Sequence, residues 1–325
     1  MVVSTLELLA SKRPDPLGVS FNLPRSGTYF PLGFRLEIAT NSRHVIEAAG
    51  ESWAGRKQEF ECDPLVMRVV VRPEGELSGE CTHRKQGHLY SVVSDAYNFA
   101  HVDLRSQFAF VQVSDKTASD HSWLRWFFLE SLPYLMLAQR RVVMVHAGCV
   151  ERNGSGVLLC GASESGKSTL AYACARAGMS WVADDCTCLL PDSAERIAIG
   201  RSQQARFRLD APALFPELEQ FTIRARPTGK IGIEVCLSDV PGIRTAGRAR
   251  IAVLAFLERR PGPPDTRRIP GDEAVDRLLA DMPAYGEDID ELHERTVRGL
   301  AEAPAYRVRY QSIDDGVKII SSLAV

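Results

Sequence analysis

The chain has 325 residues, enough for one large domain or two ordinary ones, and its 45% hydrophobic and 25% charged content is typical of a globular protein. A formal net charge of −2 gives no electrostatic reason to expect nucleic acid or an anionic membrane as a partner. The eight cysteines lie mostly in apolar runs, which excludes a disulfide scaffold, and no signal peptide is evident, so we expect a cytoplasmic protein.

Short valine- and aromatic-rich segments fill the first third of the chain. The expected strands are Leu65–Val71, Leu89–Val93, Phe99–Leu104 and Phe108–Val113. Their spacing of about ten residues predicts antiparallel pairing. Proline and glycine interrupt residues 1–60 and obscure the elements there. We expect residues 1–118 to form a small β-rich region, and we interpret His83, His88 and His101 as structural because their spacing is not that of a metal site.

The apolar segment Trp123–Gln139 is expected to form a helix at the start of a second region, residues 119–325. Asp120 and Ser122 precede this helix as candidate N-caps. The segment contains two charges and a proline and is too short to span a bilayer, so it is predicted to be a buried or amphipathic helix.

A phosphate-binding motif follows. The sequence GASESGKS matches G-x-x-x-x-G-K-[ST], and it lies between an apolar strand and a predicted helix, Thr169–Ala177, with Gly178 at the C-cap position. Lys167 is expected to reach the β- and γ-phosphates of a nucleotide, and the Ser168 hydroxyl to ligate Mg²⁺. The predicted cofactor-binding residues are Gly161, Ala162, Ser163, Glu164, Ser165, Gly166, Lys167, Ser168 and Thr169.

The pair Asn153-Gly154 lies between two apolar runs, which is a strong signal of a β-hairpin. Counting back along antiparallel strands from this turn places His146 opposite Gly161, the first glycine of the phosphate loop. We therefore expect the imidazole to lie beside the phosphate end of a nucleotide. The alternative is a histidine that only packs within a strand.

Two adjacent carboxylates, Asp184 and Asp185, end a short predicted strand, Ser180–Ala183. A strand–helix–strand unit returns its second strand parallel to the first, so both carboxylates are expected at the edge that carries the phosphate loop. One of them can hold Mg²⁺, and the other can accept a proton from an attacking hydroxyl. The alternative is that one of the two only caps a turn.

The order of His146, GASESGKST and VADDC resembles the C-terminal domain of HPr kinase/phosphorylase, whose fold is shared with phosphoenolpyruvate carboxykinase. The resemblance implies an α/β P-loop kinase domain that uses ATP and Mg²⁺, and a homo-oligomer is expected because that family forms hexamers. It implies Asp184 as the base, Asp185 on the metal, and His146 paired with the base. Glu164 departs from the glycine usual in that loop, and the segment that binds HPr is not recognisable.

Beyond Leu190 the pattern is less specific. Lys230, Arg206 and Arg208 could contact phosphate or substrate, although exposed basic side chains are usually only solvated. The remaining predicted elements are strands at Ile231–Leu237, Ile251–Leu257 and Tyr306–Tyr310, helices at Asp272–Leu279 and Asp288–Leu300, a terminal helix, and an exposed loop at Arg259–Pro270.

Our leading hypothesis is an ATP- and Mg²⁺-dependent kinase that phosphorylates a hydroxyl, most simply a serine of a peptide or protein. One alternative is a kinase of a small-molecule alcohol or sugar. Another is an ATP-binding regulatory module with little turnover, but such a module does not need two carboxylates at the strand end. A carboxykinase-like enzyme is less favoured because the chain is short.

Overall fold

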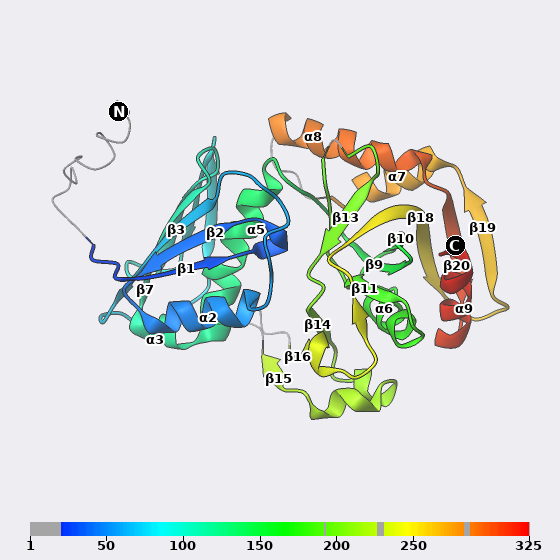
Figure 1. The fold of residues 1–325 in the computed structure, drawn as a ribbon, viewed down its shortest axis with the longest axis horizontal. Helices are drawn as coiled ribbons and strands as arrows, with labels where there is room; N and C mark the ends of the chain where they lie inside the picture. The colour runs from blue at the N-terminus through cyan, green and yellow to red at the C-terminus, as the bar shows by residue number, and fades with distance from the viewer. Residues whose placement is uncertain (1–20, 192, 226–230, 283–286, 325) are drawn as a thin grey trace. The chain divides into compact units, whose positions relative to one another are not determined.

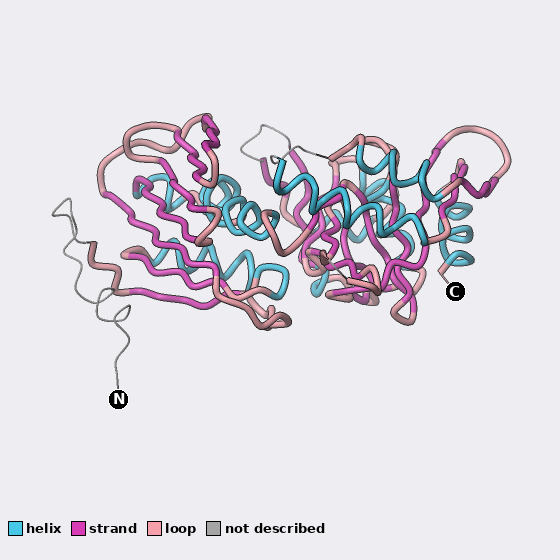
Figure 2. Tube along the Cα trace, turned by 90° about the horizontal axis from the view of Figure 1, so that it is seen from above, coloured by secondary structure: helices cyan, strands magenta, loops and turns pink. Residues whose placement is uncertain are grey.

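The computed structural model describes residues 21–191, 193–225, 231–282 and 287–324. The chain divides into two compact units, Met1–Pro133 and Tyr134–Val325. Both units combine sheets with helices, so the expected mixed α/β class is confirmed (Figures 1 and 2). All eight cysteines are free thiols, as expected. Among the described residues no helix has the length and apolar character needed to cross a membrane.

The first unit contains a sheet of strand order β1-β2-β3-β7-β6-β5-β4. Its strands are β1 Arg25–Tyr29, β2 Leu36–Thr40, β3 Leu65–Arg72, β4 Thr82–Gln86, β5 Leu89–Val93, β6 Phe99–Asp103 and β7 Phe108–Ser114. The four predicted strands are confirmed, and β4 to β7 pair antiparallel. However, β3 pairs in parallel with both β2 and β7, so the antiparallel prediction is wrong for this strand. Helix α2, Arg43–Trp53, connects β2 to β3 as a crossover and explains the first of these two pairings.

The helices of the first unit lie next to one another, and α2 and α3 cover one face of the sheet (Figure 1). They are α2, α3 Asp115–Ser119, α4 His121–Leu124, the π-helical turn η2 Arg125–Leu129, and the start of α5 Ser131–Ala138. The predicted helix Trp123–Gln139 is therefore broken into three pieces. Asp120 caps α4 by accepting a hydrogen bond from the Trp123 amide at 3.0 Å, whereas Ser122 lies inside the helix.

A buried polar network holds these helices together. Arg125 pairs with Glu130 at 2.9 Å, and the Ser52 hydroxyl on α2 donates to Glu130 at 2.9 Å. Separating these buried partners would be costly. The segment that contains Arg125 and Glu130 therefore stays packed against α2 in the first unit. The units accordingly divide at Pro133, and not at the residue 118 expected from the sequence.

The second unit is built on a larger mixed sheet, with strand order β17-β11-β9-β10-β18-β13-β12-β8, and with β20 and β19 extending from β18. Its strands are β8 Val143–Val145, β9 Ala147–Arg152, β10 Ser155–Cys160, β11 Ser180–Ala183, β12 Thr187–Leu189, β13 Ile197–Gly200, β17 Arg244–Thr245, β18 Arg248–Arg259, β19 Asp265–Ile269 and β20 Ala305–Tyr310. A small separate sheet contains β14 Gln204–Phe207, β16 Ile231–Cys236 and β15 Ile223–Ala225.

Four helices cover the two faces of this sheet (Figure 1). They are α6 Lys167–Arg176 and α9 Ile313–Leu323 on one face, and α7 Gly271–Leu279 and α8 Glu287–Arg298 on the other. The short 3-10 turns of the chain are η1 Pro31–Gly33, η3 Ala211–Ala213, η4 Pro216–Gln220, η5 Leu237–Asp239 and η6 Gly299–Glu302. Strand β10 lies at the centre, where Val157 and Leu159 face the α6 side and Leu158 and Cys160 the α7 side. This alternation explains why its sequence is continuously apolar.

Most predicted elements of the second unit are confirmed, including α6 and the left-handed Gly178 that follows it, at φ 96°. Strand β11 runs parallel to β10, as predicted, although β9 lies between them and pairs antiparallel with both. One prediction is wrong in part. The segment predicted as an exposed loop, Arg259–Pro270, contains β19, which gains its partner only through antiparallel pairing with the distant β20.

Candidate active site

The loop predicted to bind phosphate, which we call the phosphate loop, runs from the end of β10 into the first turn of α6 and contains the nine residues Gly161 to Thr169 predicted to bind the cofactor. Gly161 and Gly166 adopt φ angles of 150° and 93°, which side-chain-bearing residues rarely adopt. A Cβ atom at Gly161 would lie 2.7 Å from Ser165 Oγ, and one at Gly166 would lie 3.0 Å from the hydroxyl of Tyr310. The loop therefore requires glycine at both positions, as do loops whose backbone closes around an anion.

Lys167 opens α6, and its side chain is only 3% exposed. Its Nζ donates hydrogen bonds to the carbonyl oxygens of Gly161 at 2.8 Å and Ala162 at 3.1 Å, and lies 3.8 Å from Asp185 Oδ1. Burial lowers the pKa of the Lys167 ammonium, while the charges of Asp185 and Asp281 oppose that shift. The arrangement concentrates positive charge at the N-terminus of a helix, where anions bind favourably.

The hairpin that precedes the loop has the predicted register. Its last pair is Ala147 opposite Cys160, and its turn residues Asn153 and Gly154 have φ angles of 53° and 82°, as a type I′ turn requires. His146 is the next residue beyond this pair. The strand pairing ends before His146, whose recorded approach to the loop is through Asp185, 3.8 Å from Lys167 Nζ.

His146 contacts two carboxylates. Its Nε2 lies 2.9 Å from Asp185 Oδ1, and its Nδ1 lies 2.7 Å from Asp281 Oδ2. The prediction that His146 pairs with Asp184 is therefore wrong. Side chains of successive residues at a strand end point to opposite sides, so only one of the two aspartates can face the histidine. We refer to Lys167, Asp185, His146 and Asp281 as the His146 cluster.

Asp184 directly precedes Asp185 at the end of β11 and is partly buried, whereas Asp185 is exposed. Its Oδ2 accepts a hydrogen bond from the Arg206 amide at 3.4 Å, and its carbonyl oxygen accepts one from Ser168 Oγ at 3.5 Å. Burial raises the pKa of the Asp184 carboxyl, and the negative charge of Asp185 adds to the shift. A Cβ atom at Gly148 would lie 2.9 Å from the Asp184 carbonyl oxygen, so the close approach of β9 requires glycine there.

The sequence did not point to Asp281. It lies two residues after α7 and 135 residues from His146 along the chain, in a segment without a recognisable motif. No local signal could have identified it, because its place in the cluster depends on how α7 packs on the sheet. The structure thus adds a carboxylate to the predicted constellation.

The basic residues predicted to contact phosphate either pair with glutamates or lie outside the described residues. Lys230 is outside the described residues. Arg206 approaches Asp184 through its amide, while its guanidinium lies 3.9 Å from Glu234. Arg208 forms an exposed ion pair with Glu164 of the phosphate loop. Glu164 has φ 71°, a left-handed conformation that glycine adopts without strain and glutamate rarely adopts, at the position where the sequence departs from the expected glycine.

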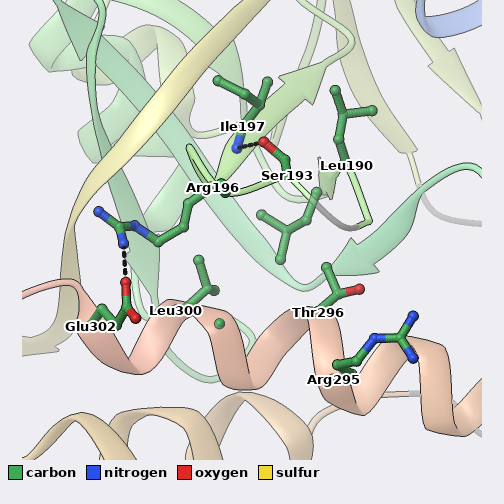
Figure 3. A pocket seen from close by; sticks show the side chains of 11 residues that line it. Leu190, Ser193, Arg196, Ile197, Arg295, Thr296, Leu300 and Glu302 are labelled. Carbon is green, nitrogen blue, oxygen red and sulfur yellow. Dashed lines mark hydrogen bonds and ion pairs between the residues drawn. The ribbon is translucent and has the colours of Figure 1, made fainter.

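A cavity of about 400 Å³ lies elsewhere in the second unit, between the β12–β13 connection and α8 (Figure 3). Arg196 and Glu302 form an ion pair at 2.8 Å at one side of it, and Arg295 and Thr296 line it from the helix. None of its lining residues belongs to the phosphate loop or to the His146 cluster. The cavity is therefore separate from the candidate active site.

No family model and no curated protein matches this chain. Among solved structures, the chain is similar to the Hpr(Ser) kinase/phosphatase from Coxiella burnetii, with 14% sequence identity, over 55% of this chain and 92% of that one, at a TM-score of 0.30. At this identity and TM-score the similarity is distant and carries no functional argument.

Proposed function

We propose that the second unit is a kinase that transfers the γ-phosphate of ATP, with Mg²⁺, to the hydroxyl of an acceptor, most simply a serine of a peptide or protein. One observation carries the proposal. Asp185 Oδ1 lies 3.8 Å from Lys167 Nζ and 2.9 Å from His146 Nε2. A phosphate-binding cation and a group able to take a proton are thus neighbours, which is the combination that phosphoryl transfer requires.

The loop suits the phosphates of a nucleotide. Gly161 and Gly166 give the loop positive φ angles that let backbone amides turn toward an anion, and Lys167 supplies a positive charge at the helix N-terminus. Within the described part of the chain, the buried Ser165 Oγ has no hydrogen-bond partner. Since buried polar atoms are normally paired, this oxygen supports a polar ligand in the loop.

Hard oxygen ligands suit Mg²⁺, and the Ser168 hydroxyl and the Asp184 carboxylate are the residues that would hold it. Burial raises the pKa of Asp184, and a nearby divalent cation would favour its ionised form. This assignment exchanges the two aspartate roles expected from the sequence. When bound, Mg²⁺ neutralises phosphate charge that develops during transfer.

Asp185 is the proposed base because its side chain is 61% exposed and an acceptor hydroxyl can approach it. The hydroxyl oxygen forms a bond to the γ-phosphorus, the bond to the oxygen bridging the β- and γ-phosphates breaks, and ADP leaves with that electron pair. Asp185 receives the hydroxyl proton. His146 holds Asp185 in place, and Asp281 holds His146 from the other side.

This division of roles is tested by comparing Lys167→Ala with Asp185→Asn. Binding of ATP and Mg²⁺ is measured by calorimetry, and transfer is measured from radiolabelled ATP to a library of serine-containing peptides and to water. Lys167→Ala should weaken ATP binding by about 100-fold or more, because a charged contact to phosphate is lost. Asp185→Asn should bind ATP within about threefold of the wild type but lose transfer by about 10²- to 10⁴-fold.

The matched control is Asp314→Asn, an exposed aspartate in the first turn of α9, which should change neither quantity. A folded wild-type protein that binds no nucleotide would refute the proposal as a whole. Full transfer by Asp185→Asn would refute only the choice of base. Transfer to small alcohols or sugars but not to peptides would select the alternative acceptor class. Cytoplasmic location and homo-oligomerisation stay predictions.

A further inference from the structure

Two histidines and a glutamate meet in the first unit, away from the phosphate loop in the chain. His44 and Glu47 lie one turn apart on α2, and His121 begins α4. One ligand atom from each of the three lies within 4.8 Å of the other two. The two imidazoles are 77 residues apart in the sequence, so only the packing of α4 against α2 brings them together.

The spacing of the ring nitrogens fits two ligands of one metal ion. His121 Nε2 and His44 Nδ1 are 3.4 Å apart. At this distance one imidazole can donate a long hydrogen bond to the other, a bond that a bound ion would replace. Two nitrogens bound to a tetrahedral Zn²⁺ at ~2.05 Å lie about 3.3 Å apart. Glu47 Oε2 is 4.0 Å from His44 Nδ1, so a small side-chain rotation would complete a set of three ligands.

The orientation of His121 is held by a neighbouring carboxylate. Its Nδ1 lies 2.6 Å from Glu51 Oε1, and the other oxygen of Glu51 lies 3.3 Å from Arg125 Nη1. A carboxylate on one ring nitrogen directs the lone pair of the other nitrogen toward the cluster. Histidines that bind metals commonly have this support, which fixes the ring and increases its basicity.

Other histidines of the unit lack this combination. His83 Nδ1 lies 2.9 Å from the hydroxyl of Tyr90, and His101 Nδ1 lies 2.9 Å from Ser91 Oγ. Each is satisfied by a hydroxyl on a neighbouring strand, as expected from the sequence for structural histidines. They provide an internal comparison for the cluster on α2 and α4.

We propose that the first unit binds a divalent transition-metal ion, with Zn²⁺ as the best match, through His44 Nδ1, His121 Nε2 and the Glu47 carboxylate. Glu51 acts as the positioning residue. Imidazole and carboxylate ligands suit Zn²⁺, and three protein ligands at a partly exposed position leave a fourth site for water. The ion would join α2 to the start of α4 and so strengthen the contact between them.

The experiment uses untagged full-length protein treated with a chelator and then titrated with Zn²⁺ against a chromophoric competitor. We expect one tight equivalent per chain in the wild type, lost in His44→Ala and weakened about 10- to 100-fold in Glu51→Gln. His83→Ala, which removes an exposed histidine of the same unit, should keep the equivalent. Co²⁺ in place of Zn²⁺ should give the visible absorption of a tetrahedral site in the wild type and not in His44→Ala.

Circular dichroism in the absence of metal shows whether each variant is folded, and Glu47→Gln gives a second ligand variant if His44→Ala is not. A wild type that binds no Zn²⁺ overturns the proposal. So does a tight equivalent that survives in both His44→Ala and Glu47→Gln, because the ion would then be held by other residues.

Discussion

In the first unit, Arg125 and Glu130 pair at 2.9 Å with side chains that are only 6% and 5% exposed. In the second, Asp185 and Asp281 contact His146 at similar distances but are 61% and 56% exposed. The first group is enclosed by protein and contacts mainly other protein groups. The second keeps one side open, beside a buried lysine and a glycine-rich loop. We infer that the enclosed group serves folding and that the open group is available to a substrate.

The energetics of the two groups should differ accordingly. A buried ion pair is costly to break because the remaining charge has no solvent to stabilise it. Charges that water already solvates contribute little to stability, so their removal mainly affects what they bind. Two substitutions separate these effects, and a third tests the partly buried Asp184 next to the open group; they follow from the largest expected change to the smallest.

Replacing Arg125 by alanine should lower the free energy of unfolding of the first unit by about 3–5 kcal/mol, because Glu130 would remain buried without its main cationic partner. Hydrogen exchange of β3 amides, followed by mass spectrometry, would measure this loss. Exchange in β10 and ATP binding should not change. Arg176→Ala, which removes an exposed ion pair with Glu217, is the control and should cost about 1 kcal/mol or less. Equal costs for the two variants would contradict the comparison.

Asp281→Asn should reduce kcat by about 10-fold, since Asp281 positions His146 and does not touch the reacting atoms. KM for ATP should stay unchanged, and stability should change by less than about 1 kcal/mol because the side chain is exposed. Steady-state kinetics with the peptide library provides both constants. Asp276→Asn, an exposed aspartate on α7, serves as the control. A change in KM alone would show that Asp281 does not act through His146.

Asp184→Asn should make the ligand-free second unit more stable at neutral pH. A carboxyl whose pKa rises on folding binds more protons in the folded state, so stability is highest at low pH. The stability that the protonated Asp184 contributes is lost as the pH rises from the ordinary carboxyl pKa of 3.8 through the raised pKa of Asp184 in the folded state. Denaturant unfolding at pH 7 and pH 4, followed by exchange in β10, tests this. An asparagine variant less stable than the wild type at pH 7 would contradict it.

The predictions from the sequence were most accurate where structure is determined locally. The Asn153-Gly154 turn sets the hairpin register, and the predicted register is confirmed as far as the pair Ala147–Cys160. They failed where partners are distant. Strand β3 was expected to pair antiparallel because α2, concealed among prolines and glycines, was not recognised as a crossover.

The sequence by itself determined the phosphate loop, the hairpin and the two aspartates at the strand end, because glycine conformations, turn residues and strand alternation act over a few neighbouring residues. Only the tertiary structure decided that His146 faces Asp185, that Asp281 joins it, and that His44 meets His121. Each of these contacts depends on how separate elements pack against one another. Packing is driven by the burial of whole apolar faces, so no local sequence motif marks the residues that it brings together.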